Sequence, residues 1–166
     1  MGKRRSAREK ALQVLFELEF HDFDEEGVLL RHGREKKTPA AVREYTDWLV
    51  RGVTSRRAEI DRLVQGVSKN WRVSRMPLVD RNILRMAAYE LLEEKSMAPA
   101  IVINEAIEIA KKYSGDEAAF FVNGVLDAVR KKLEAASASP EVKNAEPRQE
   151  HAKKRTPAAA RRGQKK

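Results

Sequence analysis

The chain has 166 residues, with 34 Lys and Arg against 25 Asp and Glu, a formal net charge of +9, and no cysteine. This length fits one or two small domains, and the lack of cysteine excludes disulfides, thiolate metal sites, iron–sulfur clusters and cysteine nucleophiles. No apolar run approaches the roughly 20 residues of a membrane-spanning helix, and the charged start is unlike a signal peptide. We therefore expect a cytoplasmic protein with no membrane partner.

The excess positive charge lies at the two ends of the chain. Residues 1–8 carry four basic side chains and no acid, and residues 137–166 carry nine basic side chains against three acidic ones. The remaining residues, 9–136, hold 21 basic and 22 acidic side chains and are close to neutral. Basic ends of this kind attract polyanions, nucleic acid above all, although they also serve simply to keep a protein in solution.

The segment between the two ends has the pattern of helices almost throughout. A capping-box spacing at Ser6–Glu9 predicts that the first helix begins there, beside the basic cluster, and the acidic stretch 22–27 interrupts the apolar pattern. Prolines at 39, 77 and 99 precede rows of apolar residues at helical spacing. We expect an all-α protein of about six helices, each burying one face in a bundle.

The composition changes after residue 136. Residues 137–166 contain three prolines, no aromatic residue and one branched aliphatic side chain, Val142. Such a segment has too little apolar surface to offset the entropy lost on ordering. The predicted organisation is therefore a helical domain over 1–136 and a disordered basic tail over 137–166.

The sequence does not match the patterns for catalytic or metal-binding sites that we tested. The stretch Asp22-x-Asp24-x-Glu26-Gly27 begins like an EF-hand loop, but its twelfth position is Gly33, where calcium binding requires a bidentate Glu. The three histidines share no spacing that would make a zinc or acid–base site, and no glycine spacing matches a phosphate-binding loop. We expect no enzyme, no metal and no cofactor.

Four segments, in a fixed order, are specific enough to identify a family. The segments are RRSAREKALQVLF (4–16), VDRNILRMAAYEL (79–91), VINEAIEIAKKY (102–113) and FVNGVLD (121–127).

Together these segments resemble the NusB family of bacterial transcription antitermination factors, over roughly residues 3–134 and weakly between 20 and 40. The resemblance implies two packed three-helix bundles and a non-enzymatic adaptor that binds boxA leader RNA. In this family the partner is the small-subunit ribosomal protein NusE, and the pair acts in the RNA polymerase antitermination complex, notably on ribosomal RNA operons. The family also supports ribosome biogenesis, and because some members pair, a homodimer stays open.

The resemblance also implies RNA-binding positions in two parts of the chain. Arginines near the N-terminus would hold phosphates, and aromatic residues around the start of the last helix would stack bases. Structural alternatives remain for three positions: Arg8 would pair with an acid, Phe121 would join the core beside Val125, and the acid at 117 would complement a helix dipole. The implied RNA-binding positions are Lys3, Arg4, Arg5, Arg8, Tyr113, Glu117 and Phe121.

Two further positions align with the NusE-binding surface of the family, Phe16 and Asp80. An acid at the start of a helix also needs no partner, because it complements the helix dipole. Gly124, a signature position, is expected to permit close approach between helices.

Two competing functions are the RNA-binding module of an RNA methyltransferase and a helix-turn-helix DNA regulator. A methyltransferase would need a cofactor-binding domain after the RNA-binding module, and the sequence after residue 136 is too short to form one. The second needs a recognition helix with clustered basic and amide side chains, whereas Arg81 and Arg85 lie among acids.

Overall fold

The computed structural model describes residues 2–20, 24–33 and 38–138, and every regular element in these ranges is helical. The all-α prediction is confirmed. The last helix ends two residues beyond the predicted domain boundary at 136, and the rest of the predicted tail lies outside the described residues. In chain order the elements are α1 (Lys3–Leu18), α2 (Glu25–Gly33), α3 (Ala40–Ser55), α4 (Arg57–Val67), the 3-10 helix η1 (Val73–Arg75), α5 (Leu78–Glu93), α6 (Pro99–Tyr113) and α7 (Asp116–Ala138).

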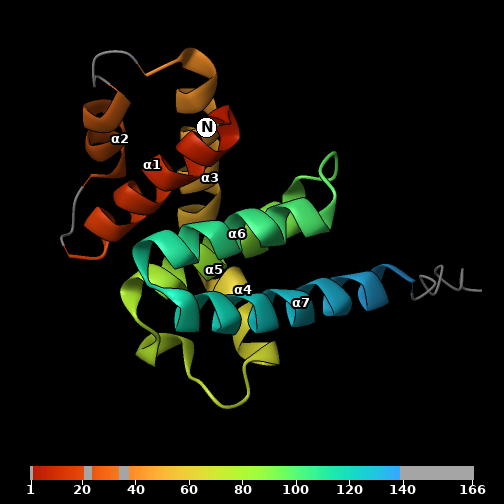
Figure 1. The fold of residues 1–166 in the computed structure, drawn as a ribbon. Helices are drawn as coiled ribbons and strands as arrows, with labels where there is room; N and C mark the ends of the chain where they lie inside the picture. The colour runs from red at the N-terminus through yellow and green to blue at the C-terminus, as the bar shows by residue number, and fades with distance from the viewer. Residues whose placement is uncertain (1, 21–23, 34–37, 139–166) are drawn as a thin grey trace, which may run out of the picture.

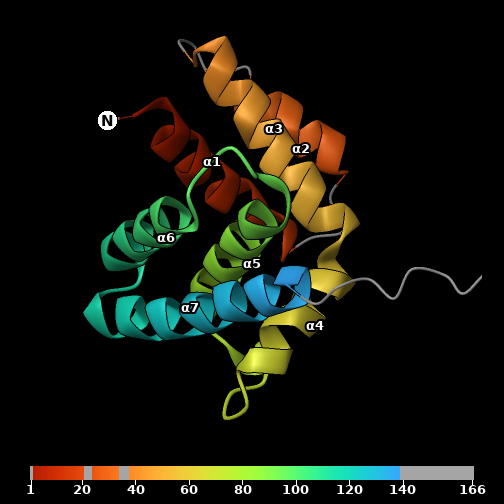
Figure 2. The same cartoon turned by 90° about the vertical axis from the view of Figure 1, so that its right-hand side faces the viewer.

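Helix α5 lies at the centre of the fold. Helices α1–α3 gather on one side and α4, α6 and α7 pack on the other, so that two helical groups share α5 (Figures 1 and 2). Every side chain of α5 from Asn82 to Leu91 is buried, which is typical of a helix covered on all faces. No helix in the described part of the chain is long and apolar enough to cross a membrane.

Helix α2 accounts for the difference between about six predicted helices and the seven α-helices observed in the described residues. The acidic stretch that was expected only to interrupt the pattern instead supplies Glu25 and Glu26 to the first turn of α2. Acids at this end complement the helix dipole. Val28 and Leu29 then bury the short helix against the core.

The start of α1 also differs from the prediction. The prediction that the helix begins with a capping box at Ser6–Glu9 is wrong. Helix α1 already begins at Lys3, and Gly2 occupies the N-cap position without a side-chain capping bond. The basic cluster therefore lies in the first turns of a helix. This geometry gives each cation a fixed direction relative to the neighbouring helices.

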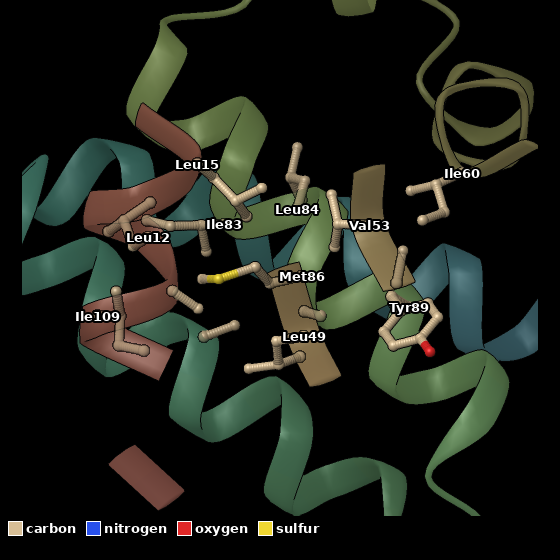
Figure 3. Close-up of a cluster of buried hydrophobic side chains, with 14 of the residues drawn as sticks. Leu12, Leu15, Leu49, Val53, Ile60, Ile83, Leu84, Met86, Tyr89 and Ile109 are labelled. Atoms are coloured by element: carbon tan, nitrogen blue, oxygen red, sulfur yellow. The ribbon is translucent and has the colours of Figure 1, made fainter. Parts of the chain in front are cut away.

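The core is built around α5, with buried side chains from α1, α3, α4, α6 and α7 (Figure 3). Gly52 allows α3 and α5 to approach closely, because an added Cβ would lie only 2.0 Å from Cζ of Tyr89. The expectation for Gly124 is wrong: this residue is exposed, and an added Cβ would meet no atom within 4 Å. The labelled core side chains are Leu12, Leu15, Leu49, Val53, Ile60, Ile83, Leu84, Met86, Tyr89 and Ile109.

Candidate nucleic-acid interface

Two of the predicted RNA-binding cations, Lys3 and Arg4, are exposed on the first turn of α1. The Arg4 guanidinium lies 5.3 Å from the centroid of the Tyr45 ring and 3.8 Å from a carboxylate oxygen of Glu94. A hollow of about 420 Å³ opens here between α1 and α3, and it is lined by Lys3, Arg4, Tyr45 and Trp48 among others. The start of α1 thus offers cations beside aromatic rings at an open surface.

Arg5, the next predicted cation, is held by a carboxylate of α6. Its Nε and Nη2 donate to the two oxygens of Glu105 at 2.8 and 2.7 Å, and its side chain is 35% exposed. The hydrogen bond from Arg5 lowers the pKa of the Glu105 carboxyl below its usual value. Arg5 is therefore a fixed, half-exposed guanidinium with edges still turned to solvent.

Arg8 is placed differently from the other predicted cations. Its side chain is 3% exposed, and its Nε and Nη2 donate to the carboxylate of Glu90 at 3.0 and 2.8 Å. Tyr45 donates its hydroxyl to the same carboxylate, and burial raises the pKa of Tyr45 above its usual value. The structure thus has Arg8 paired with an acid, as in the structural alternative, and out of reach of a surface ligand.

The turn between α6 and α7 carries Tyr113 and Glu117, both exposed. Gly115 makes the turn with φ of +100°, a conformation that favours glycine. The ammonium of Lys112 lies 5.1 Å from the centroid of the Tyr113 ring and pairs with Glu9 at 3.0 Å. This ion pair fixes the C-terminal end of α6 beside α1.

Phe121 is partly buried against the core and also reaches the surface. Its ring meets the ring of Trp71 edge-on, with centroids 6.4 Å apart, and Trp71 is 58% exposed. The preceding residue, Phe120, is 79% exposed. Sequence reasoning missed both Trp71 and Phe120; an aromatic residue inside a run of basic ones was the available signal for Trp71.

Helix α6 connects the cationic start of α1 with the aromatic turn. Glu105, which holds Arg5, and Tyr113 are eight residues apart on α6, or about 12 Å along a helix. The Lys112–Glu9 pair keeps α1 alongside over this distance. Arg5, Tyr113 and Glu117 therefore lie along the α1–α6 pair and at its end, whereas Lys3 and Arg4 line the hollow between α1 and α3.

The two predicted NusE positions differ in exposure. Phe16 is 38% exposed and meets Phe20 edge-on, with ring centroids 4.9 Å apart. Asp80 is 6% exposed and accepts a hydrogen bond from the hydroxyl of Ser114. Phe16 is open to a partner, whereas Asp80 joins α5 to the α6–α7 turn.

Known proteins match this chain over nearly all of its described helices. A model of the NusB family matches residues 5–131. The transcription antitermination protein NusB of Desulforapulum autotrophicum is 46% identical over 132 residues, covering 78% of this chain and 92% of that protein. The protein of the same name from Acidothermus cellulolyticus is 46% identical over 140 residues, covering 84% and 95%.

Solved structures show the same fold. NusB of T. maritima has a TM-score of 0.73 and 37% identity to this chain, covering 78% of it and 91% of that chain. The structure of antitermination factors NusB and NusE in complex with dsRNA has a TM-score of 0.71 and 31% identity, covering 80% and 98%.

The helical fold and these matches define a class of protein, the non-enzymatic transcription antitermination factors. Within that class, the chain belongs to the NusB family. The sequence-based identification of the family is confirmed.

Proposed function

We propose that this chain is an RNA-binding adaptor that joins boxA-type single-stranded leader RNA to NusE within the RNA polymerase antitermination complex. Ribosomal RNA operons are its proposed targets, with support of ribosome biogenesis as a second role. A role on nascent transcripts implies a cytoplasmic protein. The structural relative in complex with NusE and dsRNA supports both partner classes.

The cationic start of α1 is the observation that carries this proposal. Its first turn contains no acid, and Lys3, Arg4 and Arg5 all have exposed surface. The partial positive charge of a helix N-terminus adds to these cations. Such a site binds phosphates and releases their counterions, which makes the affinity fall as salt rises.

The aromatic turn supplies the contacts to bases in this proposal. Tyr113 and Phe121 offer rings for stacking, and the exposed carboxylate of Glu117 can accept a hydrogen bond from an exocyclic amino group of a base. Phosphate contacts at α1 position the strand, and base contacts at the turn give specificity.

For NusE, we propose that Phe16 is a direct contact, since it forms an exposed apolar surface with Phe20 at the end of α1. For the buried Asp80 we propose an indirect role, through the turn that it holds by its bond to Ser114. A homodimer is the alternative use of the same apolar surface. Sedimentation of the chain alone and with NusE separates these two arrangements.

The test of RNA binding replaces Lys3, Arg4 and Arg5 by Ala and leaves the buried Arg8 in place. Each phosphate that is no longer neutralised should reduce the slope of log K against log salt by about 0.7, so the triple variant should show a slope smaller by up to about 2. Helicity and the unfolding midpoint should stay close to those of the parent. Titrations with boxA RNA, with and without NusE, measure the effect.

A matched control replaces three exposed cations on other helices, Arg43, Arg62 and Lys131, by Ala. This variant has the same net charge as the first, so general electrostatics alone would weaken both equally. Equal slopes for the two variants would reject the start of α1 as the phosphate site.

A DNA regulator is the second function to be tested, and the structure argues against it. Its reading helix would be α5, whose side chains from Asn82 to Leu91 are buried and cannot enter a groove. Binding is compared among single-stranded boxA RNA, its duplex, the same sequence as DNA and scrambled RNA. Equal affinity for all four ligands would count against an adaptor for boxA RNA.

A further inference from the structure

The connection between α4 and α5 carries a cluster of basic residues that the proposed function does not use. Lys69, Arg72 and Arg75 are exposed there, and the sequence from Ser68 to Met76 contains no acid. No ion pair within residues 2–20, 24–33 and 38–138 involves these three cations. Most other arginines of the described chain are paired with carboxylates, so this cluster is a concentrated source of unbalanced positive charge.

The backbone of this connection is firmly held. The carbonyl of Trp71 accepts hydrogen bonds from Ser68 Oγ at 3.1 Å and from Gln65 Nε2 at 3.3 Å. The amide of Val73 donates to Gln65 Oε1 at 3.0 Å, and the side chains of Val73 and Met76 are buried. The exposure of the Trp71 ring is therefore set by a fixed loop.

Trp71 extends the aromatic surface of the turn. Its ring is 58% exposed and meets Phe121 edge-on at 6.4 Å between centroids, with an interplanar angle of 70°. Figure 1 shows this connection below the N-terminal end of α7, where the α6–α7 turn also lies. The two contacting rings, Trp71 and Phe121, and the exposed cations of the same connection, Lys69, Arg72 and Arg75, are together called the Trp71 platform below.

We infer that the Trp71 platform is a second binding surface for single-stranded RNA, beyond the start of α1 and the α6–α7 turn. A base stacks on the indole of Trp71, and the neighbouring phosphates bind the cations. An exposed tryptophan among unpaired cations fits a polyanion with flat bases better than a neutral or basic protein surface. This inference rests on the proposed function, because it extends the path of the same strand.

The inference predicts a dependence on RNA length. The start of α1 and the platform lie at opposite ends of the path along α6 and the turn, so a short strand cannot occupy both. Substitutions in the platform should leave the affinity for an RNA of about 4 nucleotides unchanged, because that RNA binds at α1 alone. The same substitutions should lower the affinity for an RNA of about 12 nucleotides.

The first experiment uses the full chain with Trp71→Ala, Trp71→Phe and the double variant Arg72→Ala/Arg75→Ala. Trp71→Ala should lower the affinity for the longer RNA about tenfold. Trp71→Phe should keep most of that affinity, because a phenylalanine ring still stacks on a base. The double variant should lower the salt slope by about 1.4, at about 0.7 for each phosphate. Arg43→Ala/Lys131→Ala, on α3 and α7, is the control with the same net charge.

A second readout reports stacking directly. The chain has two tryptophans, so the Trp71 signal is the difference in fluorescence between the full chain and Trp71→Phe. The longer RNA should quench this difference, and the shorter RNA should leave it nearly unchanged. Circular dichroism melts of each variant confirm that the helices persist.

The outcomes separate this inference from the proposed function. Loss of RNA binding in the α1 triple variant but not in the platform variants overturns the inference and leaves the function standing. If neither the α1 triple variant nor the platform variants change RNA binding, the inference and the proposed function are both overturned. If Trp71→Ala weakens NusE binding and leaves affinity for the longer RNA unchanged, the platform is a protein contact and the inference is wrong.

Discussion

Arg8 and Glu90 form a charged pair inside a hydrophobic core, with 3% and 1% of their side chains exposed. The charge of Glu90 is well satisfied, because both of its oxygens accept from the Arg8 guanidinium and one also accepts from the Tyr45 hydroxyl. Burying such a pair costs desolvation energy that its hydrogen bonds offset only when all partners are present. The pair links α1 to α5 and holds the cationic start of α1 in place.

Replacing Glu90 by Gln should therefore destabilise the protein strongly. The substitution removes the buried countercharge of Arg8 and leaves only the partly exposed Glu105 carboxylate, 3.5 Å from the guanidinium. The free energy of unfolding should fall by about 3 kcal/mol in urea titrations, at the lower end of the range for a broken buried pair. The double variant Arg8→Met/Glu90→Leu, which removes both charges, should recover most of this stability. If the single variant is as stable as the parent, the pair is not the buried anchor that its geometry indicates.

The same residues show a limit of sequence reasoning. Arg5 and Arg8 are one helical turn apart and chemically identical, yet one keeps a solvent-exposed edge and the other is buried. The difference is set by Glu90, which lies 82 residues away in the sequence. Residue type and local spacing could nominate both arginines for RNA, but only tertiary contact separates them.

At the scale of elements, the sequence predicted α3 to α7 well because their apolar residues recur at helical spacing beside proline signals. It missed α2 and misplaced the start of α1. Cations in a first turn oppose the helix dipole, so local rules place the start of the helix too late. Glu94, which precedes α6, and Glu105, which lies on it, offset that cost from outside the helix.

Glu19, the C-cap of α1, joins three helices through one carboxylate. It pairs with Arg57 at the start of α4 and, on α5, with Arg85 at 2.6 Å and Arg81 at 3.3 Å. Burial alone would raise the pKa of Glu19, but these three guanidinium groups outweigh it and hold the pKa below its usual value. The ionised carboxylate is therefore a stabilising link between elements.

Acid should remove this link. Because the folded pKa of Glu19 is lowered, its contribution to stability is complete above the unfolded pKa of about 4.3 and is lost as pH falls through the folded value. Glu19→Gln should reduce stability near pH 7 and flatten the loss of stability in acid. Urea titrations from pH 7 to about 3 measure both effects, with the exposed Glu134→Gln as the control. Parallel acid limbs for Glu19→Gln and the parent would contradict the role of this carboxylate.

For the whole molecule, the position of unbalanced charge matters more than its sum. Within the described helices, pairs such as Arg5–Glu105 and Lys112–Glu9 balance much of the charge between elements. Exposed cations then remain at the start of α1, where Arg4 and Arg5 also face carboxylates, and on the Trp71 platform. The sequence after residue 138 adds further positive charge. These three regions should attract a polyanion, whereas the rest of the molecule carries little net charge.

The third region can be removed without touching the helices. A chain ending at residue 138 lacks nine Lys and Arg of the sequence and three Glu, and it keeps α1 to α7 intact. We expect its unfolding midpoint to match that of the full chain, because no helix is shortened. Its affinity for boxA RNA should fall several-fold at about 50 mM salt and approach that of the full chain at about 200 mM or above, since counterion release drives the binding of phosphates to these cations.

A full-length variant with those nine cations replaced by Gln separates charge from length. If the basic side chains bind phosphate, this variant should reproduce both the weaker binding and the shallower salt slope of the shortened chain. Identical slopes for the full chain, the Gln variant and the shortened chain would mean that the C-terminal charge makes no contact with RNA. The phosphate contacts would then be confined to the helical part of the molecule, where the α1 and Trp71 variants locate them.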